Sequence, residues 1–146
     1  MTTSAALPPP GRDPGYGWLP AANAYDADHL ADPGAYDRAT GTWRFQVSAG
    51  GYSRVTLTNF LGGLSWTPAL GDYDGDGVAD PGVYQEQTGD WKVRLSSVAF
   101  GIFMLPGFIG GPGYAAAAAD YDGDGVIDPG VFQAQTGNWK VRLSTA

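Results

Sequence analysis

Carboxylates at a fixed spacing are the residues of this 146-residue chain best suited to chemistry. Two segments, Asp72 to Asp80 and Asp120 to Asp128, follow the pattern D-x-D-x-D-G-x-x-D. Four carboxylates within nine residues repel one another when packed together, so such a loop needs a cation if it folds back on itself. Oxygen ligands suit Ca²⁺, whereas Mg²⁺ prefers fewer protein ligands and Zn²⁺ prefers nitrogen and sulfur. The sequence therefore predicts two calcium loops.

The predicted ligands are the side chains at loop positions 1, 3, 5 and 9 and the backbone carbonyl at position 7, while glycine at position 6 permits the sharp turn. They are Asp72, Asp74, Asp76, Val78 and Asp80 in one loop, and Asp120, Asp122, Asp124, Val126 and Asp128 in the other. An EF-hand would need glutamate at position 12, where this chain has Val83 and Val131. Because these ligands form a closed set with no evident substrate position, the predicted metal is structural.

The loops belong to a repeat of 48 residues without insertions. Gly71 to Ser96 and Ala119 to Ser144 are identical at 21 of 26 positions, and Asn23 to Ser48 matches the former at 12 of 26. In this first copy Ala24 and His29 replace the first aspartate and the turn glycine, so Asp26, Asp28 and Asp32 are only weak metal candidates. Such regularity predicts structural modules stacked on copies of themselves. The predicted units are an N-terminal partial repeat (1–22) and three repeats (23–70, 71–118 and a truncated 119–146).

Each repeat reads as a run of short β-strands. Trp91, Val93 and Leu95 alternate with polar residues, and a Thr-Gly pair before them supplies a hairpin turn. The segments 52–61 and 100–109 read as a further strand. With 23 glycines and 11 prolines in the chain, long helices are not expected. The prediction is an all-β chain whose three 48-residue repeats are β-propeller blades.

On these residues the chain resembles the FG-GAP or VCBS type of calcium-binding β-propeller repeat, in which DxDGDGxxD joins strands of the propeller. The motif is complete at Asp72 to Asp80 and at Asp120 to Asp128, and the likeness extends over residues 23–146. The resemblance implies the same calcium ligands. It also implies an extracellular, secreted setting, although the opening MTTSAALPPP has no signal-peptide pattern.

Three blades are too few for a propeller ring, whose known forms have about four to eight. We therefore expect the chain to bind copies of itself. Two copies would give six blades and three copies nine, and the former is favoured. The alternative is a piece cut or designed from a longer array.

Composition argues against several classes of partner and activity. A net charge of −7 argues against nucleic acid and anionic membranes as partners, and no apolar run is long enough to span a membrane. The chain has one histidine and no cysteine, and no Ser/His/Asp pattern of a nucleophile with its base is visible, so we expect that the protein is not an enzyme. The leading hypothesis is a non-catalytic scaffold or interaction module that binds proteins. The alternative is a carbohydrate-binding lectin that uses aromatic residues of the inter-blade loops, Trp18, Trp66 and Tyr114.

Overall fold

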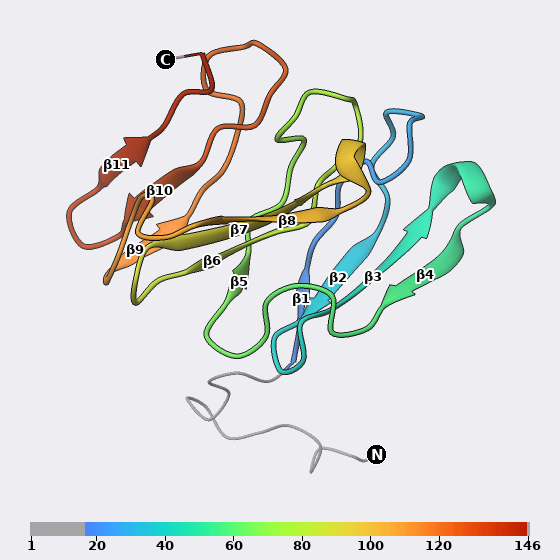
Figure 1. Ribbon diagram of the computed structural model, residues 1–146, viewed down its shortest axis with the longest axis horizontal. Coiled ribbons are helices and arrows are strands. Elements are labelled where there is room, and N and C mark those ends of the chain that lie inside the picture. The colour runs from blue at the N-terminus through green and yellow to red at the C-terminus, as the bar shows by residue number, and fades with distance from the viewer. Residues whose placement is uncertain (1–16, 146) are drawn as a thin grey trace.

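The computed structural model describes residues 17–145, which form three antiparallel β-sheets in succession along the chain (Figure 1). The first sheet consists of β1 (Trp18–Pro20), β2 (Gly34–Asp37), β3 (Thr42–Val47) and β4 (Ser53–Leu57). The second consists of β5 (Thr67–Pro68), β6 (Gly82–Gln85), β7 (Asp90–Leu95) and β8 (Gly101–Leu105). The third consists of β9 (Tyr114–Ala116), β10 (Gly130–Gln133) and β11 (Asn138–Val141). The all-β prediction is confirmed.

Every sheet is a meander in which each strand pairs with its neighbours in sequence. The predicted hairpin is present in all three, as β2–β3, β6–β7 and β10–β11. Its turn glycine has a positive φ each time, 72° at Gly41, 75° at Gly89 and 74° at Gly137, a conformation in which a Cβ atom would be strained. Two 3₁₀ turns, η2 (Ser48–Gly50) and η3 (Ser96–Val98), follow β3 and β7.

The structure differs from the predicted strands in two respects. A short strand precedes each acidic loop, and the segments containing Trp66 and Tyr114, expected to be connecting loops, lead into or belong to β5 and β9. These strands have two or three residues, too few for a visible alternation, and β5 includes Pro68. The second difference is strand length: β4 and β8 have five residues each, whereas the sequence predicted strands over 52–61 and 100–109. Both strands lie at an edge of their sheets.

The cores lie between consecutive sheets. Trp43 and Tyr36 of the first sheet are fully buried with Val83 of the second, and Trp91 and Tyr84 of the second pack in turn with Val131 of the third. The alternation of Trp91, Val93 and Leu95 thus marks a face turned toward the next sheet. The sheets are stacked face to face, as expected for repeated modules.

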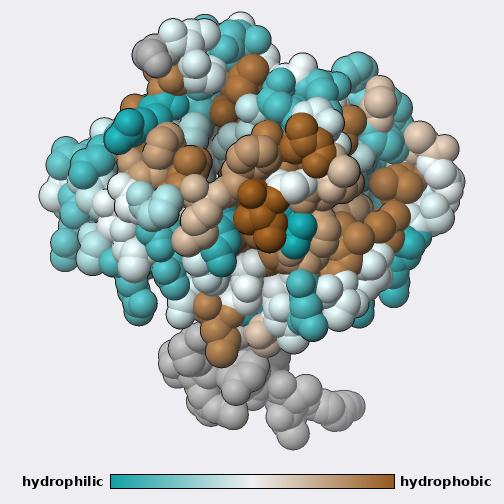
Figure 2. Space-filling view, in the orientation of Figure 1, coloured by the Kyte–Doolittle hydropathy of each residue, from teal (hydrophilic) through white to brown (hydrophobic). Residues whose placement is uncertain are grey.

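Apolar side chains also reach the surface. Figure 2 shows them gathered near the centre of one side, over β8, where Ile102, Phe103 and Met104 are exposed. Within residues 17–145 no helix has the length and apolarity that crossing a membrane would require.

Candidate metal centres

Each acidic loop connects the first two strands of its sheet and is closed by a pair of backbone hydrogen bonds. The residue before the loop pairs with the aspartate at position 9, as in Gly71 with Asp80 and Ala119 with Asp128. The first copy has the same bridge, from Asn23 to Asp32. The repeat therefore fixes the loop ends identically in all three sheets.

Two of the loops bring three carboxylates together. Oxygens of Asp72, Asp74 and Asp80 all lie within 4.8 Å of one another, and so do oxygens of Asp120, Asp122 and Asp128. These are positions 1, 3 and 9 of the loop. Oxygens at such separations can bind one cation, so each triad is a candidate metal centre.

The aspartate at position 9 is the buried member of the triad. One Asp80 oxygen accepts the backbone N–H of Tyr73 at 2.7 Å and the other accepts that of Ser96, also at 2.7 Å. Asp128 accepts the corresponding bonds from Tyr121 (2.8 Å) and Ser144 (2.6 Å). Burial raises the pKa of Asp80, and a bound cation would oppose this shift by favouring the carboxylate.

The aspartate at position 1 shapes the loop. Asp72 accepts backbone N–H bonds from Gly75 at 2.7 Å and Gly77 at 2.8 Å. Both glycines have a positive φ, 79° and 88°, which lets their N–H groups point inward. Asp120 is bonded in the same way to Gly123 and Gly125. The predicted turn glycine at position 6 is thus confirmed, and position 4 needs one as well.

The aspartate at position 5 lies outside the triads. Asp76 accepts the N–H of Val78 at 2.9 Å and the hydroxyl of Ser96 at 2.8 Å. Asp124 makes the equivalent bonds to Val126 and Ser144, and the Ser144 hydroxyl is the main reason that the pKa of Asp124 is lowered. The ligand roles of Asp76, Asp124 and the Val78 and Val126 carbonyls stay predictions.

A pair of hydroxyl residues after the third strand completes each loop, and sequence reasoning missed it. Ser97 donates to Asp74 at 2.5 Å, and Thr145 donates to Asp122 at 2.6 Å. The sequence carries a signal for this contact. Ser96-Ser97 and Ser144-Thr145 accompany the two complete loops, whereas the first copy has Ser48-Ala49.

The first loop differs from the other two in its residues. Ala24 offers no carboxylate, Ala27 replaces the glycine at position 4, and His29 has a φ of 66° where its counterparts are glycine. Among residues 17–145, Asp26, Asp28 and Asp32 do not form a three-carboxylate group of the kind found in the other two loops. Asp28 accepts the hydroxyl of Ser48, as Asp76 does that of Ser96, whereas Asp26 accepts the backbone N–H of Ala49 in place of a hydroxyl.

Neighbouring loops are joined by their backbones. The carbonyl of Ala24 in the first loop accepts the N–H of Ala79 in the second at 2.7 Å. The carbonyl of Asp72 accepts the N–H of Ile127 in the third loop at 2.8 Å. Asp72 therefore contributes its carboxylate to a candidate centre and its backbone carbonyl to the next loop, so the candidate metal centre and the stacking of the sheets share a residue.

The aromatic lectin candidates Trp18, Trp66 and Tyr114 each have a basic side chain over the ring. The cation comes from the same sheet in each case, with Arg44 over Trp18, Lys92 over Trp66 and Lys140 over Tyr114 at 4.4 to 4.5 Å from the ring centre. A cation over one ring face contributes about 0.5–1 kcal/mol at an exposed site. It also covers one of the two ring faces on which a sugar can stack.

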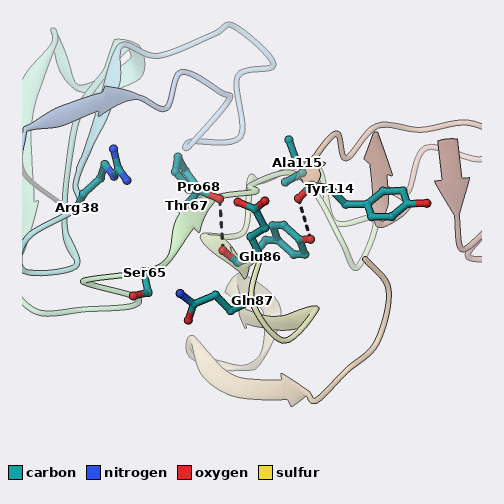
Figure 3. Close-up of a pocket in the computed structure, with 10 residues that line it drawn as sticks. Arg38, Ser65, Thr67, Pro68, Glu86, Gln87, Tyr114 and Ala115 are labelled. Atoms are coloured by element: carbon teal, nitrogen blue, oxygen red, sulfur yellow. Dashed lines mark hydrogen bonds between the residues drawn. The ribbon is translucent and has the colours of Figure 1, made fainter. Parts of the chain in front are cut away.

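A cleft of about 370 Å³, which we call the polar cleft for the charged and amide side chains on one wall, lies between the second and third sheets and reaches Arg38 of the first; its lining is polar and apolar in similar parts. Its walls include Arg38, Glu86, Gln87 and residues of β5 and β9 (Figure 3). Tyr114 borders it, but Figure 3 shows the ring pointing away from Glu86 and Gln87. Trp18 and Trp66 are not part of its lining.

The two triads can hold a hard cation, and their carboxylates are held in place by backbone and hydroxyl donors before any ion binds. Comparison with protein-family models, with curated proteins and with solved structures gives no match. The resemblance to FG-GAP or VCBS propeller repeats therefore rests on the sequence of this chain and on no matched relative.

Proposed function

We propose that this chain is a non-catalytic, calcium-binding β-propeller module that acts as an assembly or interaction scaffold. The observation that carries the proposal is the pair of Asp triads at equivalent positions of consecutive sheets. Calcium suits carboxylate oxygens in a glycine-bent loop better than zinc does. Its role would be structural, because the loop carboxylates also hold the segment that follows the third strand.

The propeller arrangement is supported by the meander topology and the stacking of sheets on one another. In this arrangement β1, β5 and β9 would lie nearest the ring axis and β4 and β8 at its rim. An extracellular setting fits the proposal, since calcium there is abundant enough to fill sites of modest affinity.

Calorimetric titration with Ca²⁺ tests the metal sites. We expect two ions per chain, reduced to one by Asp74→Asn and likewise by Asp122→Asn, because each change removes one carboxylate from a triad. Asp26→Asn in the first loop is the matched control and should leave two. No binding at millimolar Ca²⁺, or a loss caused by the control, would contradict the proposal.

A carbohydrate-binding module is the second candidate, and the polar cleft is the observation that favours it. Arg38, Glu86 and Gln87 offer donors and acceptors of the kind that bind sugar hydroxyls. A glycan array tests this. Binding that is lost in Glu86→Ala and retained in Trp18→Ala would support a lectin acting through the cleft, and an array without signal would reject it.

A further inference from the structure

We propose that a second copy of this chain docks on the uncovered face of the third sheet, through the outer face of its own first sheet. The idea rests on the propeller arrangement proposed above, and it adds the partner and the two surfaces.

The uncovered face has two buried equivalents in the same chain. Trp43 and Trp91 have no exposed surface, whereas Trp139 at the same repeat position is 56% exposed. Around it Tyr121 and Leu143 are exposed as well, and Phe132 lies 4.8 Å from the Trp139 ring. A contiguous aromatic and aliphatic patch of this kind marks an interaction surface. We call these four residues the Trp139 face.

The chain also shows, twice, what covers such a face. Val83 of the second sheet packs with Trp43 and Tyr36, and Val131 of the third packs with Trp91 and Tyr84. Both valines are fully buried. The Trp139 face should therefore be covered by a sheet surface of the same kind, on which the repeat position of Val83 and Val131 is exposed.

One copy of that covering surface, on the first sheet, is not covered by any part of residues 17–145. On the first sheet the position of Val83 is held by Ala35, which is half-buried, and its neighbours Trp18 and Arg44 are exposed. A shallow groove of about 220 Å³ lies here, with Ala35 and Arg44 in its lining. Alanine in place of valine leaves more room for an incoming side chain. Residues 17–145 thus present two complementary surfaces, the Trp139 face and this outer face of the first sheet.

Backbone groups at the loops fit the same contact. The carbonyl oxygen at position 1 of each loop accepts the backbone N–H at position 8 of the next loop, as Ala24 does from Ala79 and Asp72 does from Ile127. Among the described residues, the carbonyl of Asp120 and the N–H of Ala31 have no such backbone partner. If a second copy stacks on the third sheet as the third sheet stacks on the second, the N–H of its Ala31 would donate to the carbonyl of Asp120.

The contact is head to tail, because the two surfaces differ. Head-to-tail contacts close into a ring when the rotation permits and otherwise extend without end. Two copies contain six sheets, within the range of about four to eight that propellers use. We therefore infer a closed ring of two chains with two identical contacts.

Light scattering during gel filtration tests the ring. The chain should have twice its 15.2 kDa mass. Trp139→Glu and Ala35→Glu, which place a charge on opposite sides of the contact, should each give a monomer. Ile102→Glu, on exposed β8 and outside both surfaces, is the matched control and should remain a dimer.

Mixing the two charged variants separates this arrangement from other dimers. Each brings one intact surface, so the mixture should recover one of the two contacts and form a heterodimer. A contact between two Trp139 faces would instead leave Ala35→Glu dimeric and give no recovery. That result, a monomeric or trimeric parent chain, or a mixture that stays monomeric would overturn the inference.

Calcium titration of the same variants keeps the two proposals apart. Monomeric Trp139→Glu that still binds two ions is folded, and its mass then reports on docking alone. A parent chain that dimerises without binding calcium would reject the metal proposal and leave the docking surfaces standing.

Discussion

At the scale of single residues, the aspartate at loop position 9 has a role that does not depend on metal. Asp32 is fully buried although its loop lacks a triad, and it accepts backbone N–H bonds from Tyr25 at 2.7 Å and Ser48 at 2.8 Å. Burial is the largest single influence on the pKa of Asp32 and raises it. The hydrogen bonds that Asp32 accepts together outweigh burial, so the net effect is a lowered pKa. The residue ties the loop to the end of β3 as a carboxylate.

Asp32→Ala should therefore lower the free energy of unfolding by about 3 kcal/mol, because it leaves two backbone donors without an acceptor in a buried site. Urea denaturation should give the same loss in Ca²⁺ and in chelator. Asp26→Ala is the control, since its bond to Ala49 is exposed and water can replace it, and it should cost less than about 1 kcal/mol. A loss confined to Ca²⁺ would show that the first loop binds metal.

At the scale of elements, tight turns fix how each sheet meets the next. Tyr36 accepts the N–H of Gly63 at 2.8 Å, and Tyr84 accepts that of Gly111 at 3.0 Å. The preceding glycines, Gly62 and Gly110, have a φ of 94° and 106°. A Cβ atom at Gly62 would lie 2.3 Å from the Tyr36 hydroxyl oxygen.

Gly62→Ala should accordingly destabilise the chain more than positive φ alone explains. Strain in this backbone region costs about 1–2 kcal/mol, and the contact with buried Tyr36 adds to it. Gly51→Ala isolates the first effect, because Gly51 has a φ of 69° and open space around it. Thermal unfolding should show a clearly larger fall in Tm for Gly62→Ala. Equal falls would mean that Tyr36 moves aside at no cost.

The sequence anticipated these elements unevenly, for physical reasons. Alternation and Thr-Gly turns predicted the hairpins because both signals are local. The motif spacing predicted that loop positions 1, 3, 5, 7 and 9 would converge, and the carboxylates of positions 1, 3 and 9 lie together. The sequence did not predict strands β5 and β9, because they are defined by pairing with β6 and β10, which lie too far along the chain to be seen in a short stretch of sequence. Trp91 and Trp139 are both followed by Lys-Val-Arg-Leu-Ser and preceded by Thr-Gly and one polar residue, so the local sequence does not distinguish the buried Trp91 from the exposed Trp139; the packing of a following sheet does.

At the scale of the whole molecule, the two junctions between neighbouring sheets differ in how directly they involve a predicted calcium ligand. The second and third sheets are joined through Asp72, a predicted calcium ligand, whereas the first and second are joined through Ala24. Metal binding stabilises a folded state by about 2.7 kcal/mol per site when the ion is present at a hundred times its Kd. Removing calcium should therefore loosen the junction of sheets two and three more than that of sheets one and two.

Hydrogen exchange read by mass spectrometry can resolve this asymmetry. On chelation we expect faster exchange in residues 72–80 and 120–128, including the amide of Ile127, because the triad carboxylates repel one another once the cation is gone. Residues 24–32 serve as the internal control and should exchange at an unchanged rate. Uniform acceleration along the chain would show that calcium stabilises all three sheets as one cooperative unit, and no change in any loop would show that the hydrogen bonds hold the carboxylates without metal.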